Sequence, residues 1–365
     1  MVVFFTLLCN GQMQAQFLTR VLAPDDHIGN HIPWYMPDRT VIVDAPYIDV
    51  ESVLEQDRIN KREMPRVGIP QEVNYSLQDG QFYFSDKYTI WNFTLRSRGA
   101  KAMSIRLDNS RLPEDAVMFV YNEENRFVSS PLSHKDFKDG MFRSDYMNGD
   151  QITLSVYIPS VDLALFQMNV STYDHSVQSS YAFDSQFEAS EPCHRNVACS
   201  EGNGWECEID AVCKIVHSDI GYCTGTLINN GCCDLTSYIL TANHCAQNEA
   251  TEAFYDIDDY VYRFNYQSPQ CSPNGETSPG QWIVYVGSDL RANWNYDDGT
   301  DFGLLELFDN IDYTLGDVSF AGWNREVNPP TDEVVSIHHP LGDVKKISVN
   351  SDGVTTQGDY WIIEQ

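Results

Sequence analysis

The sequence has 365 residues, of which 42% are hydrophobic, so it can bury sizeable cores, is not a disordered chain, and is expected to form two domains. Its 53 acidic and 23 basic residues give a net charge of -30, which argues against nucleic acid and anionic membranes as partners because both bind basic surfaces. We interpret the acidity mainly as a source of solubility.

The chain begins with an apolar segment at residues 2–8, followed by polar residues and Ala15. This pattern is typical of a secretory signal peptide, here without the usual basic start, and predicts cleavage near Ala15. We therefore assign residues 1–16 to a signal peptide. A lipid anchor on Cys9 is disfavoured, because Leu8 stands where a small residue is required. No later segment is long and apolar enough to cross a bilayer, so the sequence predicts an exported and soluble protein.

Residues 17–75 show a mixed pattern interrupted by prolines, in which a charged stretch at 51–62 is expected to form a short helix. From about residue 80 to 172 the pattern predicts β-structure. Aromatic and β-branched residues at 81–85 and 88–96 predict two strands. Residues 152–158 alternate between apolar and polar side chains, which predicts a half-buried strand. Several short strands separated by turns favour a β-sandwich over about 80–172.

Residues 173–192 are rich in serine and acidic residues, so they are predicted to form a linker in which a processing site could lie. Strands are expected again after Cys193, at 237–241, 261–266, 282–286, 303–307 and 334–337.

The cysteines are concentrated in the second half of the chain. Cys9 lies near the start, and the other nine of the 10 cysteines fall between residues 193 and 271. This density is typical of an oxidising compartment with disulfides. Zinc is disfavoured because no paired C-x-x-C with matching histidines is present. An odd number leaves at least one thiol free or paired outside this chain.

A histidine follows directly after a predicted strand in the stretch Tyr-Ile-Leu-Thr-Ala-Asn-His-Cys at 238–245. A histidine in such a place is most often structural. Here Cys-Thr-Gly-Thr-Leu-Ile lies just upstream at 223–228, and a disulfide between Cys223 and Cys245 would hold the histidine turn. This context favours a functional role for His244.

These two stretches resemble the catalytic-histidine region of chymotrypsin-fold serine peptidases, and in particular that of the bacterial lysyl endopeptidases. Four further segments resemble this subgroup in the same order, at 193–205, 300–307, 321–323 and 336–340. The resemblance covers about residues 190–365, and the β-rich region before it is similar to the pro-regions found upstream of such peptidases.

Taken together, the apolar start, the β-rich pattern and the resemblance predict an all-β chain with three parts. These are the signal peptide at 1–16, a pro-region at 17–187 with its β-sandwich-like part, and a trypsin-like serine peptidase domain at 188–365. The peptidase domain is expected to be a chymotrypsin-like double antiparallel β-barrel whose second barrel is incomplete.

Acyl transfer by serine requires an imidazole base and a carboxylate that orients it. His244 is the candidate base. Asp301, just before the apolar stretch 302–307, is the candidate orienting carboxylate, although without the resemblance it would be read as a turn or strand-cap residue. The nearby Asp297 and Asp298 are read as part of a solvated loop.

The family's serine lies in a Gly-x-Ser-Gly-Ser-Pro-like turn after the His-His-Pro segment, and the 365 residues contain no such turn. We therefore expect the nucleophile beyond residue 365, and we expect residues 1–365 alone not to catalyse acyl transfer. Neither Ser319 nor Ser336 has a motif that would make it a substitute.

The resemblance also implies disulfides between Cys199 and Cys271 and between Cys223 and Cys245, with a late partner for Cys193. The remaining cysteines allow several pairings. Cys207 could pair with Cys213, or either could pair with one of two adjacent cysteines, Cys232 and Cys233.

The pair His338-His339 suggests a metal site, but adjacent residues on a strand point to opposite faces and rarely share one ion. We expect no metal and no cofactor. By resemblance, Trp323 is expected near the catalytic histidine and the substrate.

The sequence thus predicts a secreted serine endopeptidase precursor that cleaves proteins or peptides, with lysine or another basic residue suggested as the preference and its own pro-region as a partner. The alternative is a catalytically inactive binding or adhesion module, which the retention of both His244 and Asp301 argues against. A cysteine peptidase is disfavoured because a cysteine nucleophile must be reduced, whereas this cluster is expected to be bridged.

Overall fold

The computed structural model describes residues 16–36, 41–60, 62, 66–177, 190, 194–218, 221–232, 234–248, 251–271, 280–295, 300–326, 328–358 and 360–363. Strands dominate and the helices are few and short, so the all-β prediction is confirmed. The signal-peptide prediction lies outside the described residues except for Gln16, which already belongs to a strand. No helix in the described ranges is long and apolar enough to span a membrane.

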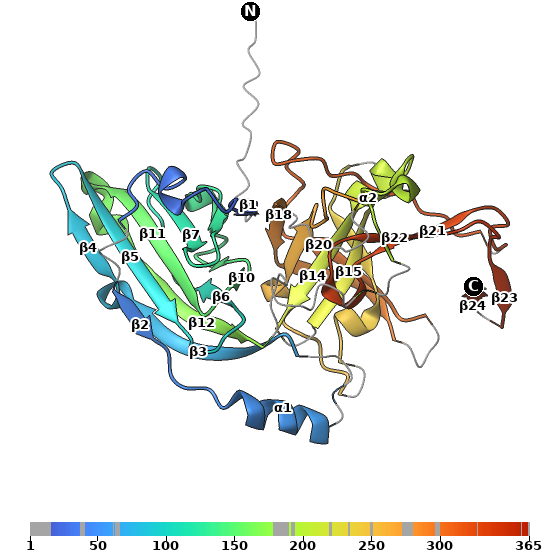
Figure 1. Cartoon of the computed structure of the whole chain (residues 1–365), viewed down its shortest axis with the longest axis horizontal. Helices are drawn as coiled ribbons and strands as arrows, with labels where there is room; N and C mark the ends of the chain where they lie inside the picture. The colour runs from blue at the N-terminus through green and yellow to red at the C-terminus, as the bar shows by residue number, and fades with distance from the viewer. Residues whose placement is uncertain are drawn as a thin grey trace, which may run out of the picture.

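We call the described residues 16–177 the N-terminal unit and residues 194–363 the C-terminal unit (Figure 1). The N-terminal unit contains β1 (Gln16–Val21), β2 (Ile42–Asp44), α1 (Val50–Ile59), β3 (Gly68–Ser76), β4 (Gln81–Phe84), β5 (Tyr88–Arg96), β6 (Ala102–Leu107), β7 (Val117–Asn122), β8 (Phe127–Ser129), β9 (Phe142–Arg143), β10 (Met147–Asn148), β11 (Gln151–Pro159) and β12 (Asn169–Ser176).

The C-terminal unit contains β13 (Arg195–Asn196), α2 (Glu206–Ala211), β14 (Val212–His217), β15 (Gly221–Ile228), β16 (Tyr238–Thr241), β17 (Val261–Phe264), β18 (Gln281–Val286), β19 (Ser288–Trp294), β20 (Phe302–Leu307), β21 (Val334–His338), β22 (Lys346–Asn350), β23 (Thr355–Gln357) and β24 (Tyr360–Ile362).

The N-terminal unit is built like a sandwich. Strands β8-β7-β11-β5-β2 form one sheet, with β4 also on β5, and β10-β6-β12-β3 form the other, with β9 on β6. Both sheets contribute to one buried core, which includes Trp91 and Leu154 from the first sheet and Ile105 and Tyr173 from the second. The helix predicted at 51–62 is α1, whose first turn is capped by the Asp49 carboxylate accepting the Ser52 N–H.

Strand β11 is buried on both faces, so the prediction of a half-buried strand at 152–158 is wrong. Its polar residues have partners that only the fold supplies. The Trp34 indole N–H donates to the Ser155 hydroxyl at 2.9 Å, and the Thr153 hydroxyl lies 2.8 Å from that of Thr94. Burial of Thr153 and Ser155 therefore does not leave these hydroxyls unpaired.

The predicted linker at 173–192 begins too early, because Tyr173 to Ser176 belong to β12 and are buried. The Asp174 carboxylate accepts hydrogen bonds from Arg143 and Tyr146, and the His175 ring lies 2.8 Å from the Ser97 hydroxyl. These partners stabilise a polar stretch inside the sheet. Most of residues 178–193 lie outside the described part of the chain.

In the C-terminal unit the strands pair in the order β19-β20-β16-β15-β14-β17-β18. The first and last strands of this run, β19 and β18, are consecutive in the chain and separated only by Gly287, which has φ +77°. The chain itself therefore joins the two ends of the run at a sharp bend.

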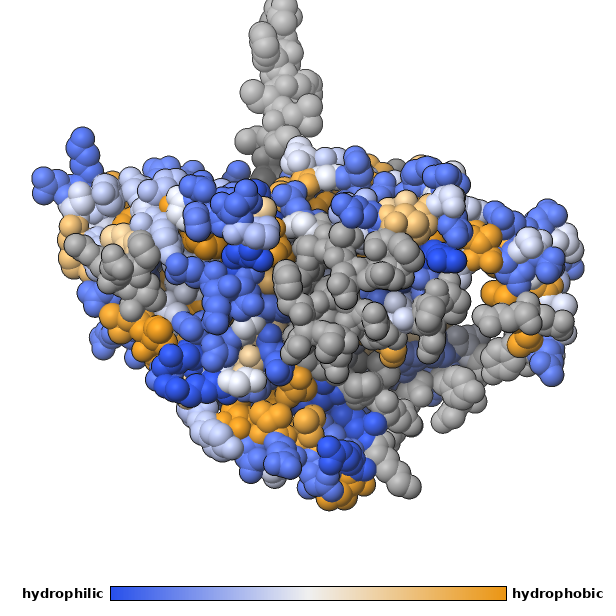
Figure 2. Space-filling model, viewed as in Figure 1, coloured by the Kyte–Doolittle hydropathy of each residue, from blue (hydrophilic) through white to orange (hydrophobic). Residues whose placement is uncertain are grey.

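By strand pairing alone, the described residues form open sheets and no closed barrel, although a double barrel was expected for 188–365. The outer edge of β18 pairs with β1 of the N-terminal unit, which carries the sheet across both units to a total of fourteen strands. Where a second barrel was expected, the structure has the sheet β13-β22-β21 and the hairpin β23-β24. The coloured part of the face in Figure 2 is mainly hydrophilic with a few hydrophobic patches, in keeping with the acidic composition.

Candidate active site

The pairing of β16 with β20 brings two distant parts of the sequence to one corner. Thr241, the last residue of β16, lies opposite Gly303, the second residue of β20. The chain leaves β16 into a short 3-10 turn, η7 (Asn243–Cys245), and enters β20 from Asp301. His244 and Asp301 therefore meet at the end of the same strand pair.

The Asp301 carboxylate contacts His244 through both of its oxygens. Oδ2 lies 2.7 Å from Nδ1 of the ring, and Oδ1 accepts the backbone N–H of His244 at 3.0 Å. The His244 side chain is 40% exposed and that of Asp301 23%. The two hydrogen bonds fix the carboxylate against the turn. Because a carboxylate only accepts hydrogen bonds, Nδ1 carries the ring proton, and Nε2 can accept a proton.

Asp301 has a positive φ of +41°, an uncommon conformation for a residue other than glycine. Such conformations persist where the surroundings hold them, and they are frequent at functional sites. Here the two hydrogen bonds to His244 stabilise the backbone conformation of Asp301.

The turn that carries His244 is fixed by a disulfide and by a hydrogen bond from a buried tyrosine. Cys223 on β15 and Cys245 form a disulfide, both sulfurs being buried. The Tyr260 hydroxyl donates to the Cys245 carbonyl at 2.7 Å. Sequence reasoning did not single out Tyr260, since a lone tyrosine after an acidic stretch carries no local pattern that points to this contact.

Thr224 links this corner to the His-His-Pro segment. Its carbonyl accepts the Thr241 hydroxyl, and its own hydroxyl accepts the His339 N–H, each at 2.9 Å. His339 is buried, and burial holds the pKa of its ring well below the usual range. A neutral ring then donates from Nδ1 to the Asp343 carbonyl at 3.0 Å.

The two adjacent histidines have different surroundings. The His338 ring packs edge-on against that of His194 with centroids 5.2 Å apart, whereas the His339 ring lies 6.2 Å from that of Tyr266. Trp323 is 59% exposed, and among the described residues no hydrogen bond or ring contact joins it to His244 or Asp301. The structure thus brings His244 and Asp301 into contact, and the expectation for Trp323 stays a prediction.

The second expected disulfide, between Cys199 and Cys271, is also present. Within the described part of the chain, Cys207, Cys213 and Cys232 are free thiols, so none of the pairings considered among these three forms. Burial raises the pKa of the Cys213 thiol to about 12, which keeps it protonated and makes it a poor nucleophile. Cys193 and Cys233 lie outside the described residues.

The sulfurs of Cys223 and Cys245 and a ring nitrogen of His244 lie within 4.8 Å of one another, a spacing that could suit a metal. The two sulfurs are bonded to each other, so neither can act as a thiolate ligand. These three residues therefore do not form a zinc site, and the disulfide instead fixes the turn that carries His244.

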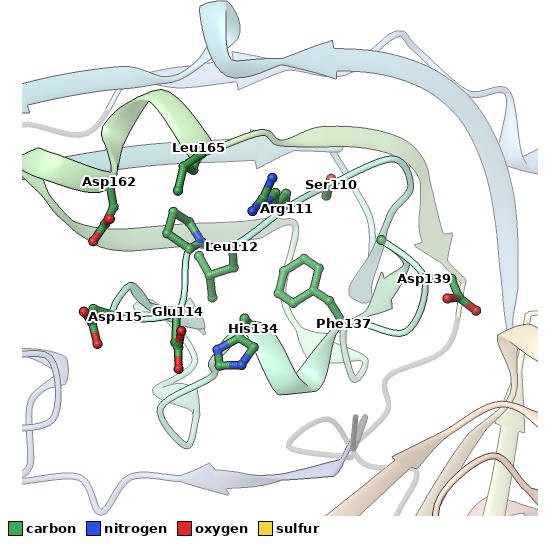
Figure 3. Close-up of a pocket in the computed structure, with 12 residues that line it drawn as sticks. Ser110, Arg111, Leu112, Glu114, Asp115, His134, Phe137, Asp139, Asp162 and Leu165 are labelled. Carbon is green, nitrogen blue, oxygen red and sulfur yellow. The ribbon is translucent and has the colours of Figure 1, made fainter. Parts of the chain in front are cut away.

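A cavity of about 480 Å³ lies in the N-terminal unit (Figure 3). Figure 3 shows three acidic side chains, Glu114, Asp115 and Asp162, toward one end of the cavity and Phe137 toward the other. No residue predicted to act in catalysis lines it, and no motif in the sequence indicated it. The acidic rim alone does not identify a ligand.

Removal of the disulfide at the histidine turn is expected to lower the free energy of unfolding. The double substitution Cys223→Ala with Cys245→Ala opens a loop with a sequence separation of 22 residues. The chain-entropy estimate for such a loop is roughly 3 kcal/mol, to be measured by urea unfolding.

The matched control is Cys207→Ala with Cys232→Ala, because both thiols are exposed and free. This pair should change the free energy of unfolding by less than about 0.5 kcal/mol. Equal losses in the two double variants would contradict a stabilising role for the disulfide.

A comparison with known protein families matches the region of the chain that contains His244 and Asp301. A family model described as the C-terminal domain of lysyl endopeptidase matches residues 187–361. The chain is also 27% identical over 287 residues to the lysyl endopeptidase of Pseudomonas aeruginosa, an alignment that covers 73% of this chain and 59% of that relative. The chain therefore spans less than two thirds of the relative's length. The family match contains both His244 and Asp301, so the chain is lysyl endopeptidase-like over residues 187–361.

Proposed function

We propose that this chain is the larger part of a secreted serine endopeptidase precursor, which hydrolyses peptide bonds in protein substrates. The observation that supports this most directly is the contact between His244 and Asp301, with both carboxylate oxygens engaged. The similarity to lysyl endopeptidases supports the same reaction class.

In the proposed reaction His244 acts as the general base. Its Nδ1–H donates to Asp301, so Nε2 carries the free lone pair and takes the proton from the nucleophilic hydroxyl. Asp301 fixes this tautomer and stabilises the imidazolium that forms. When the peptide bond breaks, the same imidazolium gives the proton to the leaving amine.

The nucleophile in this proposal is a serine C-terminal to residue 365. The 365 residues lack a Gly-x-Ser-Gly-Ser-Pro-like turn, and no hydrogen-bond partner of His244 Nε2 is found among the described residues. A preference for lysine or another basic residue is proposed from the name of the relative alone. Trp323, being exposed, is available to line the substrate cleft.

We further propose that residues 1–16 direct export, that residues 17–187 form a pro-region, and that 188–365 begin the peptidase domain. The two disulfides support an oxidising destination. Processing is proposed between residues 178 and 193, where the sequence is rich in serine and acidic residues.

The test is labelling and hydrolysis by the protein extended beyond residue 365. A fluorophosphonate probe should label the extended protein, which should cleave peptides, and residues 1–365 alone should remain unlabelled. His244→Ala should abolish both activities, while His27→Ala, an exposed histidine in the N-terminal unit, should leave them unchanged. A correctly folded extended protein without labelling or hydrolysis would reject the proposal and favour a binding module.

A further inference from the structure

Three side-chain amides form hydrogen bonds with one another next to the candidate base, and we call Asn243, Gln247 and Asn293 the amide network. Nδ2 of Asn293 on β19 donates to Oδ1 of Asn243 at 2.9 Å. Nδ2 of Asn243 donates in turn to Oε1 of Gln247 at 3.1 Å. Asn243 directly precedes His244 and is completely buried. A side chain of the edge strand β19 therefore contacts the turn that carries the base.

The order of the strands makes this contact possible. Thr241 of β16, Gly303 of β20 and Asn293 of β19 lie opposite one another in one row across three strands. Side chains of such a row project from the same face of the sheet. Gly303 has no side chain in the middle of the row, and a Cβ there would lie 3.2 Å from the carbonyl oxygen of Ala242. The glycine thus leaves room for the Asn293 amide to extend over β20 to η7.

The direction of each hydrogen bond in the amide network is determined by a backbone carbonyl. Nε2 of Gln247 donates to the carbonyl of Glu252 at 2.8 Å, so Oε1 is the atom that faces Asn243. This oxygen can only accept, and Asn243 must therefore turn Nδ2 toward Gln247 and Oδ1 toward Asn293. Asn293 has to be a donor at this position, which the carboxylate of an aspartate cannot be.

The amide network holds the peptide group that joins Asn243 to His244. The N–H of this group donates to Oδ1 of Asp301 at 3.0 Å. Its carbonyl accepts the backbone N–H of Gln247 at 2.9 Å. The side chain of Asn243 is bound by Asn293. The peptide group is thus held at both of its polar atoms, and the residue that begins it is held through its side chain.

These contacts fix the side of His244 that the disulfide does not. The bond between Cys223 and Cys245 and the Tyr260 hydroxyl hold the residue after His244. The amide network holds the residue before it. Among the described residues, no hydrogen bond joins the amide network to the ring of His244. An effect of the amide network on catalysis must therefore act through the contact between His244 and Asp301.

We infer that Asn293 is a positioning residue for the reaction, because its hydrogen bond to Asn243 holds the His244 backbone N–H where Oδ1 of Asp301 accepts it. The inference rests on the proposed function in taking His244 as the base and Asp301 as its orienting carboxylate. Asn293 acts without contact to substrate, so its loss should lower kcat and leave KM nearly unchanged.

The first test needs no peptidase activity and uses residues 1–365. Histidine labelled with the heavy nitrogen isotope reports on the backbone amides of nine histidines, and the signal lost in His244→Ala identifies residue 244. Asn293→Asp should accelerate hydrogen exchange of the His244 N–H at least about tenfold. The His339 N–H, which donates to the Thr224 hydroxyl at 2.9 Å, should keep its rate. Equal acceleration at both amides, as in a general loss of stability, or no acceleration at His244 would overturn the inference.

The second test is kinetics of the protein extended beyond residue 365. Asn293→Asp should lower kcat about 10- to 100-fold, since a displacement of about 1 Å in an active site can cost about 100-fold. The matched control is Asn230→Asp, which makes the same substitution at an exposed hydrogen bond to Asp234 in the C-terminal unit and should leave kcat unchanged.

If Asn293→Asp does not fold, Asn293→Ala removes the donor without adding a charge and replaces it in both tests. An unchanged kcat in the variant would overturn the inference. Absence of hydrolysis by the unsubstituted extended protein would instead reject the proposed function, and the exchange rates would still decide whether Asn293 holds the His244 N–H.

Discussion

Asp301→Asn is expected to lower kcat for peptide hydrolysis on the order of 10⁴-fold in the protein that carries the nucleophile. An asparagine oxygen can still accept the backbone N–H of His244, so the turn should keep its conformation. The asparagine amide then donates to Nδ1, which moves the ring proton to Nε2. In that tautomer the imidazole cannot accept the proton of the nucleophile.

The measurement is steady-state kinetics together with circular dichroism to verify folding. KM should change little, since Asp301 acts through His244 and is not proposed to contact substrate. The matched control is Asp289→Asn on the neighbouring β19, an exposed carboxylate paired with Arg291. A fall of less than about tenfold in kcat would argue that Asp301 does not orient the base.

The site was easier to predict from the sequence than the fold around it. The residues around His244 and Asp301 form short continuous patterns, so they can be recognised locally. Their contact is not local, since 57 residues separate them and only the pairing of β16 with β20 brings them together. For Trp323, which is exposed, the motif alone does not state where the side chain lies relative to His244.

The connection between the units could not be predicted from periodicity. Residues 16–21 are too few to distinguish a strand from the end of a leader, and their partners, Phe127–Ser129 and Gln281–Val286, lie more than a hundred and more than two hundred residues away. Charged residues such as Asp145 and Arg263 are normally exposed, so a sequence pattern places them on the surface. Their burial depends on each other and on Trp282.

The same reason explains the error at Tyr173–Ser176. A run of polar residues is usually a loop, because buried polar groups without partners are costly. Here Arg143 and Tyr146 bind Asp174, and Ser97 lies beside His175, so the stretch can be an inner strand. Which polar residues find such partners is decided by tertiary structure.

Gly287→Ala is expected to lower the free energy of unfolding by about 2–5 kcal/mol. The residue has φ +77°, which costs an alanine about 1–2 kcal/mol. A Cβ at this position would overlap the Phe308 ring and lie 2.8 Å from the carbonyl oxygen of Asp258, which adds an overpacking cost of about 1–3 kcal/mol. Urea unfolding measures the loss.

Gly204→Ala separates the two contributions. Gly204 has a similar φ of +87°, but a Cβ there would meet nothing within 4 Å. This variant should therefore lose only the conformational part, about 1–2 kcal/mol. Equal losses at the two positions would mean that the space at the bend is not restricted. A larger loss at Gly287 would show that the bend joining β18 to β19 is sterically fixed. Because β19 pairs with β20 directly after Asp301, that variant should also reduce activity, whereas Gly204→Ala should not.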